Sequence, residues 1–186
     1  MNKKEIIEII EKDLWMMQIL EIVRDLDLPD WWIGAGFVRN KIWDELHEYK
    51  KRTPLNDIDV IYFNNENINK KQEKMYERKL HTKLKLPWSV KNQARMAVVR
   101  NDEVYHSAEE GLSRWVETAT CVGIKLDKDN NLILAAPHGV EDLVNLILRP
   151  TPFFSKSLKI FNERIVKKSW LTLWPKLKIN KTPLAP

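Results

Sequence analysis

Apolar residues recur at steps of three and four along much of the chain, which is the spacing that places them on one face of a helix. In the first 26 residues Ile6 and Ile10 begin such a series, and the pattern allows a break near Asp13. Other helices are bounded by residues that start or stop them, such as Ser107 and Pro150. The predicted helices cover residues 1–26, 37–47, 70–85, 107–116, 139–149 and 158–174.

Short runs rich in β-branched and aromatic residues separate these helices and are typical of strands. The predicted strands cover residues 31–33, 58–63, 88–90, 120–126 and 132–136. The polar residues 127–131 suit a hairpin loop between the last two strands. The pattern predicts an α+β fold, a small mixed sheet with helices packed on it and with N- and C-terminal helices. We expect residues 1–180 to form a single domain and residues 181–186 to form a loose tail.

Composition excludes several classes of protein. No apolar run reaches the roughly 18 residues that a membrane span needs, and the acidic residues near the N-terminus are unlike a signal peptide. We therefore expect a cytoplasmic protein with no membrane partner. The single cysteine, Cys121, excludes an internal disulfide, and its apolar setting predicts a buried thiol. The four histidines lack metal-ligand spacing, and no Walker-type or hydrolase motif is present.

The charge of the chain is modestly basic, with 31 Lys and Arg against 26 Asp and Glu. The excess gathers in residues 70–85 and 156–181, while residues 5–30 are acidic. A basic excess suits a partner that carries phosphate, although solubility alone explains it equally well. The charge therefore leaves a nucleic acid partner open without requiring one.

Candidate chemistry gathers between Trp31 and Tyr62, where a glycine-containing turn leads into a helix and a pair of carboxylates follows. Asp57 and Asp59 lie two residues apart at the start of a strand, so they face the same side, roughly 6 to 7 Å apart. Two like charges there raise each other's pKa, and a hard divalent cation such as Mg²⁺ (or Mn²⁺) relieves the repulsion. The alternative is that Asp57 caps a turn and Asp59 simply faces solvent.

Several segments together resemble a bacterial family of nucleotidyltransferase-like proteins within the polymerase-beta-type nucleotidyltransferase superfamily. The segments are WWIGAGFVRNKIWDELH, TPLNDIDVIYFN, WSVKNQARM, WVETATCVGIKL and APHGVEDL, and the resemblance covers roughly residues 28–175. It implies that Gly34, Ala35 and Gly36 hold the triphosphate of a nucleotide. It also implies that Asp57 and Asp59 are the catalytic carboxylates that bind the metal.

The resemblance further implies a third acid on a neighbouring strand, and this chain departs from that pattern. The expected position, beside Trp88, holds Ser89. Without that acid, the protein either works differently or binds nucleotide without turning it over.

Three further residues are predicted to contact the nucleotide. Arg39 lies in the first turns of the helix after the glycines, where it could reach phosphate. Asn92 and Arg95 belong to a polar cluster that follows a strand, where ligands often bind.

The predicted function is that of a Mg²⁺-dependent nucleotidyltransferase, which moves an NMP group from an NTP to an acceptor. The acceptor stays open between a small molecule, a protein and RNA, because all three use the same catalytic core. One alternative is a catalytically degenerate module that binds nucleotide or RNA, which Ser89 and the basic residues 156–181 favour. A protein-interaction partner is a third reading, and no motif supports it.

Overall fold

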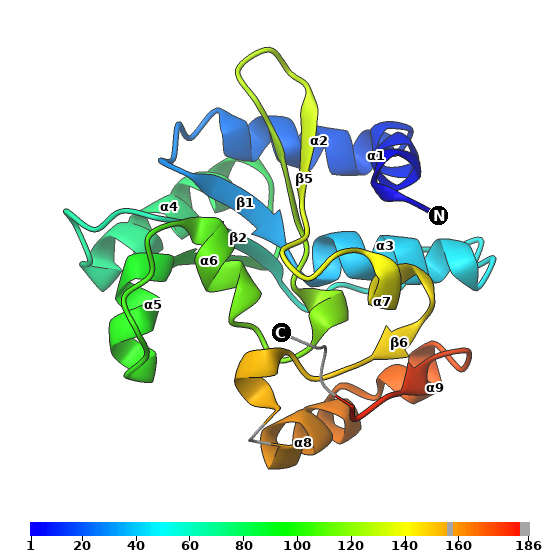
Figure 1. Cartoon of the computed structure of the whole chain (residues 1–186). Helices are drawn as coiled ribbons and strands as arrows, with labels where there is room; N and C mark the ends of the chain where they lie inside the picture. Colours follow the sequence, from blue (N-terminus) through cyan, green and yellow to red (C-terminus); the bar gives the residue numbers. More distant parts are fainter. Residues whose placement is uncertain (156–157, 183–186) are drawn as a thin grey trace.

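A five-stranded mixed sheet forms the centre of the computed structural model, which describes residues 1–155 and 158–182 (Figure 1). The strand order is β3-β2-β1-β4-β5, with β2 and β3 parallel and the other neighbours antiparallel. The strands are β1 (Trp31–Gly34), β2 (Ile58–Tyr62), β3 (Trp88–Asn92), β4 (Gly123–Leu126) and β5 (Leu132–Ala135). The fourth predicted strand begins later than expected, because Thr118–Thr120 form a 3-10 helix.

The two faces of the sheet pack against different helices, because side chains alternate between the faces along each strand. Ile33 and Val60 point into the main core, with side chains from α1 (Lys3–Glu11), α2 (Leu14–Arg24), α3 (Gly36–Leu46) and α4 (Lys70–Lys83). Trp32 and Ile61 point the other way and pack against α6 (Ala108–Ser113), which follows α5 (Gln93–Arg100). The second face therefore carries a separate and smaller apolar cluster.

The C-terminal part of the chain packs beside α3 (Figure 1). It comprises α7 (Glu141–Val144), β6 (Ile147–Leu148), a 3-10 helix (Pro152–Phe154), α8 (Leu158–Lys168), α9 (Trp170–Leu173) and β7 (Lys178–Ile179). The rings of Trp170 and Trp174 lie edge-on to Trp43 of α3, with centroid distances of 5.8 and 5.1 Å. Trp174 also donates from Nε1 to the buried Asp44 carboxylate at 2.8 Å, which anchors this segment to α3.

The first predicted helix does break near Asp13. The Asp13 side chain caps α2 by accepting a hydrogen bond from the Met16 backbone N at 3.2 Å. The predicted helix after Ser107 is also present, but it ends at Ser113 rather than near residue 116. A break and a start signal in the sequence therefore both correspond to caps in the structure.

Two predicted helices at the C-terminal side are wrong in extent. The helix expected over residues 139–149 shortens to the single turn α7, because Leu146 adopts a left-handed backbone with φ 59° and β6 follows. The last predicted helix is divided into α8 and α9, because Ser169 is left-handed with φ 51°. Neither residue is a glycine, so the sequence carries no clear sign of these turns.

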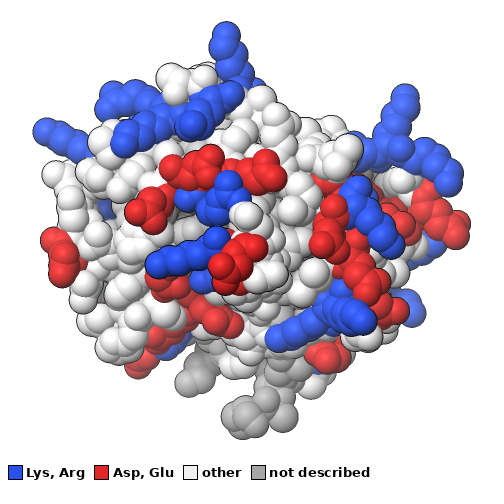
Figure 2. Space-filling view, turned by 90° about the horizontal axis from the view of Figure 1, so that it is seen from above, with Lys and Arg blue, Asp and Glu red and all other residues white. Residues whose placement is uncertain are grey.

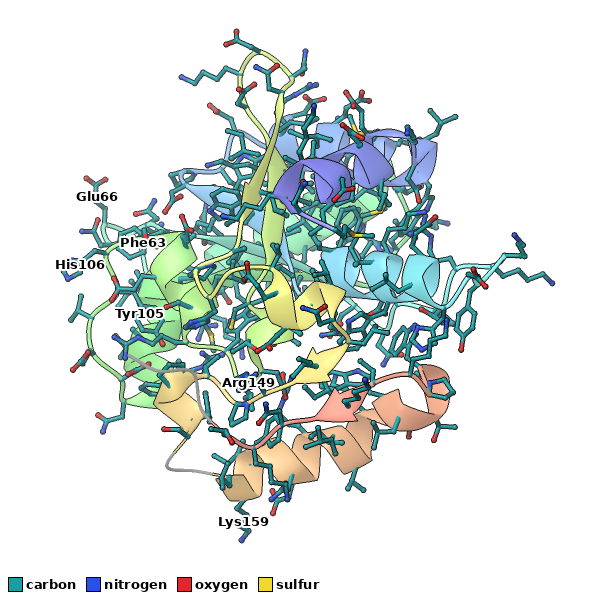
Figure 3. The ribbon with its side chains drawn as sticks, turned by 45° about the vertical axis from the view of Figure 1, so that its right-hand side comes forward. Phe63, Glu66, Tyr105, His106, Arg149 and Lys159 are labelled. Carbon is teal, nitrogen blue, oxygen red and sulfur yellow. The ribbon has the colours of Figure 1, made fainter. Side chains whose placement is uncertain are left out.

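The end of the chain is tied to the C-terminal segment by a short parallel pairing and one further bond. β7 pairs with β6, and Arg149, labelled in Figure 3, donates from Nη1 to the Thr182 carbonyl at 2.7 Å. The loose tail expected at 181–186 falls mainly on residues 183–186, outside the described residues. Among the residues described, no helix is long and apolar enough to cross a membrane.

The outer edge of the sheet is closed by side chains of α4. No strand in the described part of the chain pairs with the outer side of β3. The Asn92 backbone N of this strand instead donates to Glu73 at 2.9 Å, and its Val90 backbone N donates to Glu77 at 3.2 Å. Glu73 is fully buried and also accepts from Nε and Nη2 of Arg95, both at 2.8 Å. This carboxylate therefore fixes α4, β3 and α5 relative to one another.

We expect Glu73→Ala to lower the free energy of unfolding by about 3 kcal/mol, because it leaves the Arg95 charge unpaired in a largely buried setting. Denaturant unfolding would measure this loss. Lys71→Ala, on the exposed side of the same helix, should change stability by no more than about 0.5 kcal/mol. Equal effects of the two changes would contradict the role given to Glu73.

The turn between β1 and α3 has a strained backbone. Ala35 has φ 48° and ψ −116°, a region that residues other than glycine rarely adopt. Its backbone N donates to the Val122 carbonyl at 2.9 Å, and its carbonyl accepts from the Arg39 backbone N at 2.8 Å. The surrounding strands and helix thus hold the turn in place.

Replacing Ala35 by glycine should therefore raise the free energy of unfolding by about 1 kcal/mol, because glycine reaches this backbone conformation without strain. Thermal or denaturant unfolding measures the change. Ala97→Gly in the interior of α5 is the control and should lower stability instead. A loss of stability in both variants would show that the turn is not strained.

Candidate functional site

The two predicted carboxylates lie at the beginning of β2, on the sheet face opposite the main core. Ile58 and Val60 are fully buried in that core, so Asp59 between them points to the second face, together with Asp57. Asp57 is exposed and Asp59 is partly buried. The two carboxylates are close enough for the charge of Asp57 to act on Asp59, and their role as a metal-binding pair stays a prediction.

Ser89 lies directly beside Asp59 in the sheet. The parallel pairing of β2 and β3 places the two residues opposite each other, and hydrogen bonding by the Ser89 side chain acts to lower the pKa of the Asp59 carboxyl. The position at which the resemblance implies a third acid therefore faces the carboxylate pair. In this chain it supplies a hydrogen-bond donor instead of a charge.

Burial raises the pKa of Asp59 to about 6, and the charge of Asp57 acts in the same direction. The Ser89 hydrogen bond and the charges of Arg39 and Lys168 act against this rise. Asp59 is therefore mostly ionised at neutral pH, but its charge in this buried setting lowers the free energy of unfolding. A cation placed between the two carboxylates would offset this loss.

The glycine turn lies next to the carboxylates. Ile33 pairs with Val60, so Gly34 is one step further along β1, beside Asp59. The turn then begins α3, whose first N–H groups have no carbonyl partner within the helix and favour an anion. A side chain at Gly36 would come within 3.4 Å of Arg39 Nη2, so the bare backbone of the turn and the guanidinium stay close together.

Arg39 is a buried cation without a carboxylate in contact among the described residues. Its side chain is stacked against Trp170, with the guanidinium carbon 4.6 Å from the ring centroid, and it also faces Trp43 at 5.1 Å. Nη2 donates to Asn40 at 2.9 Å, while Nε has no hydrogen-bond partner within the described part of the chain. Burial lowers the pKa of Arg39 to about 10, so it remains charged at neutral pH. Such a group is ready to accept an anionic ligand.

Three charged residues near this site have no local signal in the sequence. Glu117 is fully buried and accepts from Nε and Nη2 of Arg164 at 2.7 and 3.2 Å, and its charge also acts on Arg39. Lys168, at the end of α8, acts on Asp59. These residues lie more than 50 positions from the carboxylates along the chain, and only the fold brings them together.

Asn92 and Arg95, in contrast, lie away from the carboxylates. Asn92 pairs with Tyr62 at the far end of β2, three residues beyond the Asp59–Ser89 pair and so about 10 Å along the strand. Its side chain binds the backbone of Asn64, Asn67 and Ala94. These hydrogen bonds tie a loop and α5 to the sheet, and Arg95 is paired with Glu73. Contact of Asn92 and Arg95 with a nucleotide stays a prediction.

A pocket of about 340 Å³ lies at that far end, and none of the predicted site residues lines it. Phe63, Tyr105 and His106 contribute to its wall, and Figure 3 shows them together on one side of the molecule. This pocket is therefore separate from the group formed by the glycine turn, Arg39 and the two carboxylates.

The carboxylate pair fits Mg²⁺ or Mn²⁺ by the chemistry of its donors. Hard divalent cations prefer carboxylate oxygens, and Mg²⁺ is commonly held by one or two carboxylates together with water and substrate phosphates. Within the described ranges, no group of three or more His, Cys, Asp and Glu side chains could hold a metal ion. Asp57 and Asp59 would thus supply part of the ligands, and a phosphate at the α3 N-terminus would supply others.

Comparison with solved structures identifies the fold. A structure described as a CCA-adding enzyme head domain is 34% identical, covers 97% of each chain and superposes with a TM-score of 0.84. A CCA-adding enzyme in complex with CTP is 14% identical, with a TM-score of 0.57 over 97% of this chain and 43% of that one. The Thermotoga maritima CCA-adding enzyme complexed with tRNA is 16% identical, with a TM-score of 0.58 over 98% of this chain and 43% of that one. The chain therefore spans less than half of these last two enzymes.

The same assignment follows from a comparison of the sequence with models of protein families. No match is found among curated proteins. A family model described as nucleotidyltransferase matches residues 21–179, which include the glycine turn, Arg39 and both carboxylates. The predicted α+β fold with a mixed sheet and the predicted resemblance are confirmed. The chain belongs to the nucleotidyltransferase family.

Proposed function

We propose that this protein is a Mg²⁺-dependent nucleotidyltransferase that moves an NMP group from an NTP to an acceptor. One observation carries the proposal. A buried cation with no ion pair to any described residue, a helix N-terminus and two neighbouring carboxylates lie at one end of β1 and β2. A nucleoside triphosphate bound with a divalent cation has the charges that complement all three.

Each element has a distinct proposed role. The backbone of Gly34, Ala35 and Gly36 and the Arg39 guanidinium hold the triphosphate, while Asp57 and Asp59 hold the metal. When bound, the metal activates the attacking oxygen and neutralises charge on the leaving pyrophosphate. The acceptor oxygen forms a bond to the α-phosphorus as the bond to the bridging oxygen of the pyrophosphate breaks.

The acceptor is proposed only as a class. The solved structures that resemble this chain include CCA-adding enzymes with CTP and with tRNA, which supports an NTP donor and makes RNA one acceptor to test. A small molecule or a protein remains an alternative, because the flanking elements set specificity in this fold.

A second candidate function is a degenerate module that binds nucleotide or RNA without catalysis. Ser89 favours it, because a neutral hydroxyl occupies the position beside Asp59 where the resemblance implies an acid. Metal-dependent NTP binding without release of pyrophosphate, on any acceptor tested, would favour this candidate over the transferase.

We further propose that residues 1–180 act as a single domain and that the protein is cytoplasmic, without a membrane partner. One apolar cluster includes residues from Ile6 to Leu177, which supports the single domain. The free and buried Cys121 is compatible with a reducing compartment.

The first test compares Asp59→Asn with the unmodified protein for binding of each NTP with and without Mg²⁺ or Mn²⁺, by calorimetry. We expect the substitution to remove the gain in NTP affinity that the metal provides, so that binding in the presence of metal weakens at least tenfold. Release of pyrophosphate should also be lost. Lys41→Gln is the matched control, because its ammonium group contacts Asp13 and Glu45 instead of the glycine turn. NTP binding that keeps its metal dependence in Asp59→Asn would refute the proposed role of the carboxylates.

A second test uses pH. Because the pKa of Asp59 is raised to about 6 from an ordinary value of 3.8, the folded protein binds this proton more tightly than the unfolded chain. The stability contributed by the proton is therefore present at low pH and lost as pH rises through about 6. Without metal, Asp59→Asn should thus be the more stable form at pH above 7, by up to about 3 kcal/mol, with little difference near pH 4.

Thermal unfolding between about pH 4 and 8, with and without Mn²⁺, measures both effects. Stabilisation by Mn²⁺ should decline below pH 6 in the unmodified protein, because protons compete for the same carboxylate. Asp129→Asn, in the exposed hairpin loop, should behave like the unmodified protein. A pH-independent difference between Asp59→Asn and the unmodified protein would contradict the raised pKa.

A further inference from the structure

The outward face of α4 carries only basic charges. Residues 70–85 contain seven Lys or Arg and two Glu, a net charge of +5 that equals the net charge of the whole chain. The two acids, Glu73 and Glu77, turn inward to the edge of β3. The exposed residues of this segment with a basic side chain are Lys70, Lys71, Lys74, Arg78, Lys79, His81, Lys83 and Lys85.

Most of these cations have no acidic neighbour. Among the described residues, Lys74 pairs with Glu77, while Lys71, Arg78 and Lys79 form no ion pair. A space-filling view shows basic side chains gathered without acids along one margin of the molecule, over α4 (Figure 2). Elsewhere in that view, blue and red side chains are interspersed. The basic side chains of this helix are therefore concentrated on its outward face.

The position of α4 relates this face to the candidate site. Glu77 contacts Val90 and Glu73 contacts Asn92, so α4 runs antiparallel to β3. The end of the helix consequently lies at the beginning of β3, where Trp88 Nε1 donates to the Leu84 carbonyl at 2.8 Å. Ser89 follows immediately and lies opposite Asp59 in the sheet. The basic face thus begins at the same end of the sheet as the carboxylates, across the edge strand β3, and extends along a helix of 14 residues, about 20 Å in length.

We propose that the outward face of α4 binds the sugar-phosphate backbone of a single-stranded nucleic acid and directs one end of that strand to the carboxylate pair. A face about 20 Å long accommodates on the order of six nucleotides. The binding surface stands on its own, and only the delivery of the strand end rests on the proposed transferase function.

The composition of the face favours nucleic acid over a membrane surface. A helix that lies on a membrane inserts apolar side chains between its charges and the acyl chains. In α4 the apolar side chains of Tyr76 and Leu80 are packed in the main core, and Met75 is only partly exposed. The outward surface is therefore suited to contact phosphates but not to enter a bilayer.

The test measures binding of a fluorescein-labelled single-stranded RNA of about 20 nucleotides by anisotropy, at salt concentrations between about 50 and 200 mM. A DNA strand of corresponding sequence and vesicles with anionic lipid are measured in parallel. The variant Lys71→Glu/Arg78→Glu/Lys79→Glu is compared with Lys50→Glu/Lys51→Glu/Lys128→Glu. The control residues are exposed, and both variants change the net charge equally. Circular dichroism confirms that both are folded.

The α4 variant should bind RNA at least tenfold more weakly, and its salt dependence should be shallower by about 2 in log–log slope, since each lost phosphate contact removes about 0.7. The control variant should stay within about twofold of the unmodified protein. Equal loss in the two variants, or tighter binding to vesicles than to either strand, would overturn the proposal. Stronger binding of one strand supports the proposal and identifies the nucleic acid that the surface prefers, and equal binding supports a surface that does not discriminate between RNA and DNA.

The outcome is independent of catalysis. The binding assay contains no NTP and no metal, so it measures RNA binding separately from the transfer reaction. Failure of RNA binding in a protein that still releases pyrophosphate would overturn the α4 surface alone. Loss of pyrophosphate release with intact RNA binding would instead count against the transferase.

Discussion

The alternation of side chains along β2 is the constraint on which the candidate site depends. Ile58 and Val60 are completely buried on one face of the sheet, and this burial forces Asp59 onto the other. A shift of the strand register by one residue would exchange the side chains on the two faces of β2 and place the Asp59 carboxylate in the apolar core. The same apolar contacts that stabilise the sheet therefore hold two like charges close together, and the stability of the core offsets the cost of that repulsion.

The opposite charges of the site come from elements that are distant in sequence. Arg39 belongs to α3, and Glu117 precedes the 3-10 helix Thr118–Thr120. Arg164 and Lys168 come from the C-terminal segment, which is anchored on Trp43 and Asp44. Glu117 is bound directly by Arg164 and so leaves Arg39 without an acid in contact among the described residues. The charges of the site therefore only partly compensate one another. In this condition a ligand with complementary charges gains the most binding free energy.

Much of the fold was accessible from the sequence because periodic apolar residues and short β-branched runs report local structure directly. The turns at the left-handed residues Leu146 and Ser169 could not be predicted, since tertiary packing holds these residues in a conformation that their identity does not suggest. For the site, spacing alone placed Asp57 and Asp59 on one side of a strand. The position of Asn92 after a strand suggested a contact with nucleotide. That position could not show that both the oxygen and the nitrogen of the Asn92 side chain bind the backbone of Asn64.

The carboxylates of α4 at the edge of β3 also have a consequence for how this protein meets others. A sheet edge with free backbone N–H groups is open to strand addition by another chain, which leads to unintended self-association. Here Glu73 and Glu77 occupy the outward N–H groups of Asn92 and Val90. Backbone pairing at this edge is therefore blocked, and a partner that approaches from this side meets side chains alone.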